Sequence, residues 1–272
     1  MKPCMNQYSI MQCDIEEFIE ACAQAGFREL ELRDSKVEAY LTDHSCKELR
    51  TLFRKHDVHV ATLNSLEYFS LVPEENFNFM LKKAEYMMTL CQLIGCDTLV
   101  SVPSKNPHHL PLSEIKSRTV ERLQGLADLG KRYGVKVLFE PIGFDFFSLR
   151  KPLDGLDIVS EIKNQEVGLL IDTFHFYVGQ NTLDDLERIP PERISFVHFH
   201  DAADRPRGEL RDEDRLYPGE GVIDLRGFCK VLKDKGYEGA LSVELINPKL
   251  WETMSPKDMA SKAWNSLKPY LS

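Results

Sequence analysis

The sequence lacks the features of several protein classes. No apolar run approaches the roughly 20 residues of a membrane-spanning helix, and Met1 to Gln7 carry no apolar signal region. We therefore expect a cytoplasmic protein with no membrane partner. The net charge is −9 and basic residues never cluster in a long tract, whereas nucleic-acid binding needs clustered Lys and Arg. Nucleic acid is therefore not an expected partner.

Cysteines are present, but they never form a C-x-x-C pair. There are seven, an odd number, which is typical of reduced thiols that pack as small core residues. This pattern argues against a zinc cluster made of cysteines. The chain also has no low-complexity segment, no clear internal repeat and no linker between domains.

Short apolar runs alternate with helical patterns along the whole chain. The apolar runs predict strands at residues 2–7, 29–33, 59–64, 98–103, 136–141, 167–173, 194–201 and 239–246. Helices are predicted at residues 14–25, 44–56, 76–94, 113–133, 154–163, 182–188, 225–235 and 255–270. About eight such units predict an α/β protein, a single (β/α)8 TIM barrel over residues 1–272.

Four consecutive predicted strands end in a side chain of a metal-binding type, namely Glu140, Asp172, His198 and Glu244. Barrel enzymes build their active sites at the C-terminal ends of the strands, so these side chains should converge. Three converging carboxylates repel each other unless a cation lies between them. A single Asp or Glu at a strand end is commonly a loop cap or an ion-pair partner. Four consecutive strand ends of a metal-binding type instead predict a shared metal. The three carboxylates and one imidazole suit one divalent ion: Mn²⁺, Mg²⁺, Co²⁺ or Zn²⁺.

Several residues near these strand ends have two interpretations each. His175 is either a surface histidine or a substrate hydrogen-bonding group at the rim of the site, and we favour the second. His200 follows His198 by two positions, so it points to the same side of its strand and could support the ligands. Asp201 could support the site or cap a loop. His108 and His109 are expected in a solvated loop.

The loop from Asp212 to Gly221 is polar and rich in turn residues. It is either a solvated connection or a lid over the barrel, with Arg215 as a clamp on the substrate. Trp251 and Tyr68 are expected in loops after the eighth and third strands. Each could form a wall for a sugar-like ligand or simply pack its own loop.

The motifs around these residues resemble those of the xylose isomerase-like barrels of sugar isomerases and epimerases, and the resemblance covers the whole chain. The matching segments are Phe139-Glu140-Pro141, Ile171-Asp172-Thr173-Phe174-His175, Val197-His198-Phe199-His200-Asp201 and Ser242-Val243-Glu244. Within the family, residues 212–225 are most similar to the inositol branch, which isomerises 2-keto-myo-inositol in inositol catabolism.

The resemblance implies one divalent metal on the four strand-end residues, with Glu140 and Glu244 as acid and base on opposite faces of the substrate. The implied partner is a small sugar or cyclitol ketone. One glutamate would remove a proton beside the ketone, and return of a proton to the other carbon of the enediolate would shift the ketone. Whether the chain forms a homo-oligomer stays open.

Other activities of the family remain open at this point. They are ketose 3-epimerase, hydroxypyruvate isomerase, inosose dehydratase and an endonuclease-like phosphodiesterase, with a silent sugar-binding barrel as a non-catalytic alternative. Related ketose epimerases carry a further glutamate six residues after the first, where this chain has Phe146. Related DNA-repair endonucleases add metal-binding histidines where this chain has Leu63-Asn64 and Pro103-Ser104. Both departures weaken the corresponding alternatives.

Overall fold

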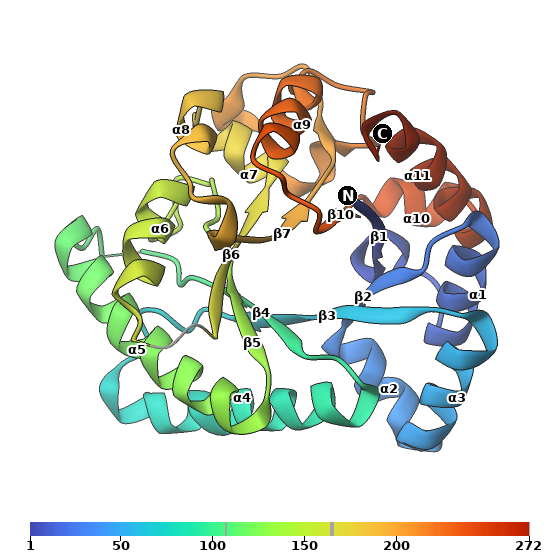
Figure 1. Ribbon diagram of the computed structural model, residues 1–272, viewed down its shortest axis with the longest axis horizontal. Coiled ribbons are helices and arrows are strands. Elements are labelled where there is room, and N and C mark those ends of the chain that lie inside the picture. The colour runs from blue at the N-terminus through green and yellow to red at the C-terminus, as the bar shows by residue number, and fades with distance from the viewer. Residues whose placement is uncertain (107, 164–165, 272) are drawn as a thin grey trace.

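Eight parallel strands close into a barrel, and helices surround it (Figure 1). The computed structural model describes residues 1–106, 108–163 and 166–271. Around the barrel the strands follow the order β1-β10-β7-β6-β5-β4-β3-β2. Their bounds are β1 (Lys2–Asn6), β2 (Glu29–Arg33), β3 (His59–Glu67), β4 (Thr98–Val102), β5 (Lys136–Phe139), β6 (Val167–Asp172), β7 (Ile194–His198) and β10 (Ala240–Val243). The predicted (β/α)8 barrel is confirmed.

The helices lie outside the barrel and in the loops above it. Their bounds are α1 (Ile15–Ala25), α2 (Asp34–Asp43), α3 (Cys46–His56), α4 (Glu74–Ile94), α5 (Leu112–Tyr133), α6 (Pro152–Glu161), α7 (Thr173–Val178), α8 (Leu183–Glu187), α9 (Leu225–Asp234), α10 (Pro248–Thr253) and α11 (Pro256–Leu271). Short 3₁₀ turns are η1 (Gln7–Ile10), η2 (Pro191–Arg193), η3 (Arg207–Glu209) and η4 (Asp212–Asp214). No helix in the described ranges is long and apolar enough to cross a membrane.

Local side-chain chemistry sets the ends of the first helices. The Asp14 carboxylate accepts a hydrogen bond from the backbone N–H of Glu17, 2.9 Å away, and Gly26 ends α1 with a left-handed φ of 116°. Ser45 and Glu48 form a reciprocal capping box at the start of α3. Such caps satisfy backbone groups that have no partner within the helix.

The barrel interior is apolar below the strand ends. A buried cluster is drawn from strands alone: Cys4, Val100, Leu138, Leu170, Phe196 and Ala240. Side chains two positions apart on a strand point to the same side. The residues two positions after Leu138, Leu170 and Phe196 therefore also point into the barrel, and they are Glu140, Asp172 and His198. The apolar layer thus forms the floor of a polar centre.

Most predicted elements begin or end within a few residues of the observed ones, and the third and seventh strands differ in ways that affect the site. The seventh strand ends at His198, and Asp201 instead starts β8 (Asp201–Ala202), which pairs with β9 (Arg215–Leu216) in a small antiparallel sheet. The third strand continues to Glu67. Three short helices, α2, α7 and α10, fall where no helix was predicted. They span ten residues or fewer, and segments of two or three turns leave only a weak periodic pattern.

Candidate metal centre

The four predicted strand-end residues meet at one point above the apolar floor. Glu140, Asp172, His198 and Glu244 each offer a ligand atom, all four atoms lie within 4.8 Å of one another, and all four residues are buried. They come from the C-terminal ends of the neighbouring strands β5, β6, β7 and β10. Barrel closure brings the strand ends together, as expected for a parallel barrel.

The spacing of the donor atoms fits a single divalent ion. Nδ1 of His198 lies 3.2 Å from Oε1 of Glu140, 3.3 Å from Oε2 of Glu244 and 3.7 Å from Oδ2 of Asp172. Nitrogen and oxygen ligands about 2.1 Å from a tetrahedral ion are roughly 3.4 Å apart. Glu140, Asp172, His198 and Glu244 would therefore hold the ion with little rearrangement.

A fourth carboxylate, absent from the predicted site, lies on the far side of His198. Glu31 on β2 is completely buried, and its two oxygens lie 3.0 and 3.1 Å from Nε2 of His198. The segment Leu30-Glu31-Leu32 places an acid inside a short, otherwise apolar strand. A buried carboxylate is costly unless it is paired, so this local conflict was a signal for a functional position.

Asn6, also absent from the predicted site, holds one of the two glutamates in place. Its side-chain amide donates to Oε1 of Glu244 at 2.9 Å, and both residues are buried. Asn6 ends β1, which is the barrel neighbour of the strand that precedes Glu244. The bond leaves Oε2 of Glu244 facing the other ligands.

Arg215 enters the centre from the loop that was predicted to be either a solvated connection or a lid. Its side chain is only 2% exposed. Nη1 donates to Oδ2 of Asp172 at 2.9 Å and to Oε2 of Glu244 at 2.8 Å, while Nη2 donates to Oδ1 of Asp212 at 2.8 Å. The buried guanidinium therefore offsets part of the negative charge of the centre, since charge-assisted bonds of this kind are strong.

Two predicted histidines contact this same guanidinium. Nε2 of His200 lies 3.0 Å from Nη1 of Arg215, and Nε2 of His175 lies 3.0 Å from Nη2. His175 belongs to α7, whose first turn is capped by the Asp172 carboxylate, and its side chain is buried. His200 also lies 3.3 Å from Oδ1 of Asp172. Both histidines are thus next to the ligand set and below the protein surface.

Burial and charge shift the pKa values of these groups in different directions. Burial raises the pKa of Glu140 to about 7, although His198 opposes the shift. Burial would also raise the pKa of Asp172, but Arg215 and the histidines hold it well below its usual value. Burial would lower the pKa of His198, but the surrounding carboxylates raise it well above normal. A carboxyl group poised near neutrality suits proton transfer.

The remaining predicted residues divide between the site and the loops. Tyr68 lines the cavity described below. Trp251 does not line it, because its indole N–H donates to the Ser9 carbonyl at 3.0 Å and its ring packs on the main core. Asp201 caps a loop, because its carboxylate accepts hydrogen bonds from the backbone N–H groups of Gly219, Gly221 and Ile223 at 2.9–3.1 Å.

A cavity of about 180 Å³ opens directly onto Glu140, Glu244 and Arg215. Its other walls mix polar and aromatic side chains, among them Tyr8, Arg33, Glu67, Tyr68, Phe144 and Phe147. The small volume and polar rim fit a small hydroxylated molecule. Polar groups on the β1–β3 side face the carboxylates across this space.

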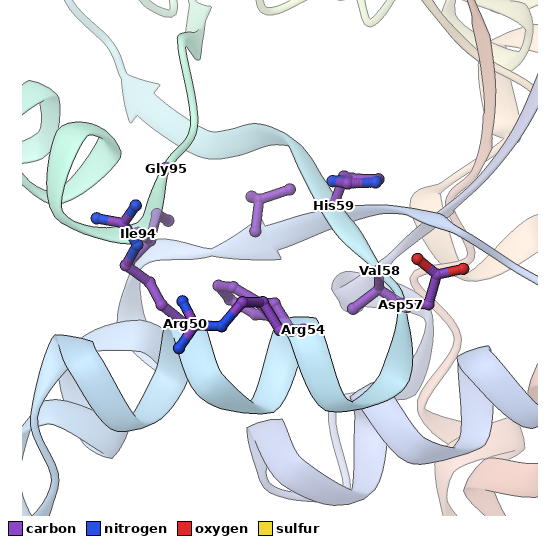
Figure 2. A pocket seen from close by; sticks show the side chains of 9 residues that line it. Arg50, Arg54, Asp57, Val58, His59, Ile94 and Gly95 are labelled. Carbon is purple, nitrogen blue, oxygen red and sulfur yellow. The ribbon is translucent and has the colours of Figure 1, made fainter.

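A second hollow, of about 340 Å³, lies at the opposite end of the barrel (Figure 2). Arg50 and Arg54 of α3 border it together with His59 at the start of β3. All three side chains are exposed. In barrel enzymes this end serves stability rather than chemistry, so the candidate centre is the cavity above the strand ends.

The chain is similar to several known proteins. The family model described as xylose isomerase-like TIM barrel matches residues 19–270. Inosose isomerase of Halalkalibacterium halodurans is 33% identical over 93% of this chain and 90% of the relative. Inosose isomerase of Bacillus velezensis is 31% identical over 93% of this chain and 91% of the relative. A crystal structure of an IOLI protein with a bound zinc atom superposes with a TM-score of 0.96 and 30% identity, covering 100% of this chain and 98% of that one.

Proposed function

Because the chain belongs to the xylose isomerase-like TIM barrel family, we propose that it is a metal-dependent isomerase of 2-keto-myo-inositol. The enzyme would shift the ring ketone to the neighbouring carbon. The observation that supports this most directly is the convergence of three buried carboxylates and one imidazole on a small polar cavity. The inosose isomerases that are similar over 93% of the chain supply the substrate class.

Glu140, Asp172, His198 and Glu244 would hold the divalent ion. When bound, it would act as a Lewis acid that polarises the ketone and acidifies the neighbouring C–H. We propose Mn²⁺, Mg²⁺, Co²⁺ or Zn²⁺, since all accept this donor set. The zinc atom in the related IOLI structure supports a divalent ion as the cofactor.

Glu140 and Glu244 are the proton-transfer groups in this proposal. Both carboxylates border the cavity, so both can reach a bound substrate. Asn6 fixes the orientation of Glu244 through one oxygen. One glutamate would take a proton from the carbon beside the ketone, and a proton returned to the other carbon of the enediolate would complete the shift.

Arg215 and His175, which line the cavity, would bind the substrate oxygens, and His200 would contribute to substrate binding through Arg215. The guanidinium lies at the cavity wall and carries a positive charge where negative charge develops on the substrate. His175 and His200 border the guanidinium and limit its movement. Trp251 is left out of this proposal, because it does not line the cavity and its indole N–H donates to the Ser9 carbonyl.

The decisive experiment follows proton exchange in D₂O. Metal-loaded protein is incubated with 2-keto-myo-inositol, and a chelator-treated sample is the control. We expect metal-dependent deuterium uptake without loss of water, together with a shifted ring ketone by NMR. Loss of water would assign a dehydratase instead, and inversion at the same carbon would assign an epimerase. The variant Glu244→Gln is tested in the same assay. Glu238→Gln is its matched control, because Glu238 is exposed and lies outside the cavity.

A further inference from the structure

The imidazole of His198 is fixed between two groups of carboxylates. Nδ1 faces Glu140 and Glu244 at 3.2 and 3.3 Å, and Nε2 faces Glu31 at 3.0 Å. The His198 and Glu31 side chains are both 0% exposed. Only one ring nitrogen can bind a metal while the other keeps its proton. The geometry therefore directs Nδ1 of His198 toward the ligand carboxylates, where a metal would bind, and Nε2 toward Glu31.

Glu31 is itself held in position by two further side chains. Asn64 donates to its Oε1 at 3.0 Å, and Ser242 donates to its Oε2 at 2.9 Å. These donors come from β3 and β10, and His198 comes from β7, so side chains of three other strands fix this one carboxylate. Nε2 of His198 faces the two oxygens of this fixed carboxylate at 3.0 and 3.1 Å, so a proton on Nε2 has an acceptor in place.

We propose that Glu31 is a positioning residue that keeps the proton of His198 on Nε2 and so presents Nδ1 to the metal. This inference rests on the proposed metal-dependent function. A histidine ligand typically donates its second ring nitrogen to a carboxylate, which fixes the tautomer and raises the basicity of the ligand. Among the described residues, Glu31 forms no hydrogen bond with the three carboxylates of the ligand set, and it does not line the cavity. It therefore acts through His198.

The test compares Glu31→Gln and Glu31→Ala with a matched control, Glu29→Gln. Glu29 lies on the same strand two positions earlier and points to the same side, but it lines a hollow at the other end of the barrel. Metal affinity is measured by competition with a chromophoric chelator, and folding is checked by circular dichroism. We expect Glu31→Gln to weaken metal binding about 10–100-fold and Glu31→Ala to weaken it more, since Gln retains an acceptor oxygen. Glu29→Gln should bind as the wild type does.

A second measurement reports the tautomer directly. The protein is labelled with ¹⁵N-histidine and loaded with ¹¹³Cd²⁺, and the signals of His198 are assigned by their absence in His198→Asn. We expect cadmium–nitrogen coupling at Nδ1 and a proton on Nε2. A purely structural role of Glu31 would not predict which nitrogen couples. Coupling at Nε2 would overturn the proposal whatever the variants do.

The outcomes distinguish this inference from the proposed function. Wild-type protein that binds no divalent ion would refute both. Wild-type binding combined with unchanged affinity in a folded Glu31→Gln variant would refute the positioning role alone. Should Glu31→Ala fail to fold, the Gln variant and the cadmium spectrum of the wild type still decide the question.

Discussion

The buried guanidinium of Arg215 allows a sharp test of the charge balance in the centre. Its side chain is 2% exposed, and its partners Asp172 and Glu244 are 0% and 7% exposed. Removing one partner of a buried ion pair typically costs roughly 3–5 kcal/mol, because the other charges remain buried without compensation. For a chain of this size, about 2–4 °C of melting temperature corresponds to each kcal/mol. Metal-free Arg215→Met should therefore melt at least about 6 °C below the wild type.

Added metal should narrow this difference. A divalent cation on Asp172 and Glu244 would replace the lost positive charge, and it would no longer be repelled by the guanidinium. Metal at about 1,000 times its dissociation constant stabilises the folded state by about 4 kcal/mol. Saturating metal should therefore raise the melting temperature of Arg215→Met by more than it raises that of the wild type.

Differential scanning calorimetry with chelator and with saturating metal measures both effects. Arg205→Met is the matched control, since Arg205 lies in the same loop region and pairs with Asp214, but its side chain is 46% exposed. Exposed pairs contribute about 1 kcal/mol or less. An Arg215→Met variant within about 2 °C of the wild type in chelator, or a difference that metal leaves unchanged, would contradict the reasoning.

Three further predictions address the acid–base group, the thiols and a helix cap. Glu244→Gln should lower turnover at least about 100-fold while retaining the fold and much of the metal affinity; near wild-type turnover would remove Glu244 from proton transfer. Burial raises the pKa of Cys13 and Cys229 to about 12, so these thiols stay protonated at pH 8, and a thiol reagent should label only the half-buried Cys46 until the protein unfolds. Rapid labelling of several thiols in the folded protein would refute this. Asp14→Ala should cost about 1 kcal/mol by thermal denaturation, and the exposed Glu20→Ala on the same helix should cost less; equal losses would argue against the cap.

The ligand set was within reach of the sequence because each of its members follows a local pattern. Short apolar runs predict strands without knowledge of the partners of each strand, and parallel barrels place all strand ends on one face. The sequence alone therefore predicts that Glu140, Asp172, His198 and Glu244 converge. The short helix α7 was missed because the Asp172 cap that begins it looks the same in sequence as a strand-end ligand.

The supporting contacts were decided by the tertiary structure alone. Glu31 and His198 are 167 positions apart, and Asn6 and Glu244 are 238 apart. Closure of the barrel brings β1 and β2 round to the strands at its other edge, and the stagger between strands selects which side chains meet. Local periodicity shows that Glu31 is unusual in an apolar strand, but not what it pairs with. The sequence by itself determined the barrel and the four strand-end groups, whereas only the packed barrel determined which groups orient and neutralise them.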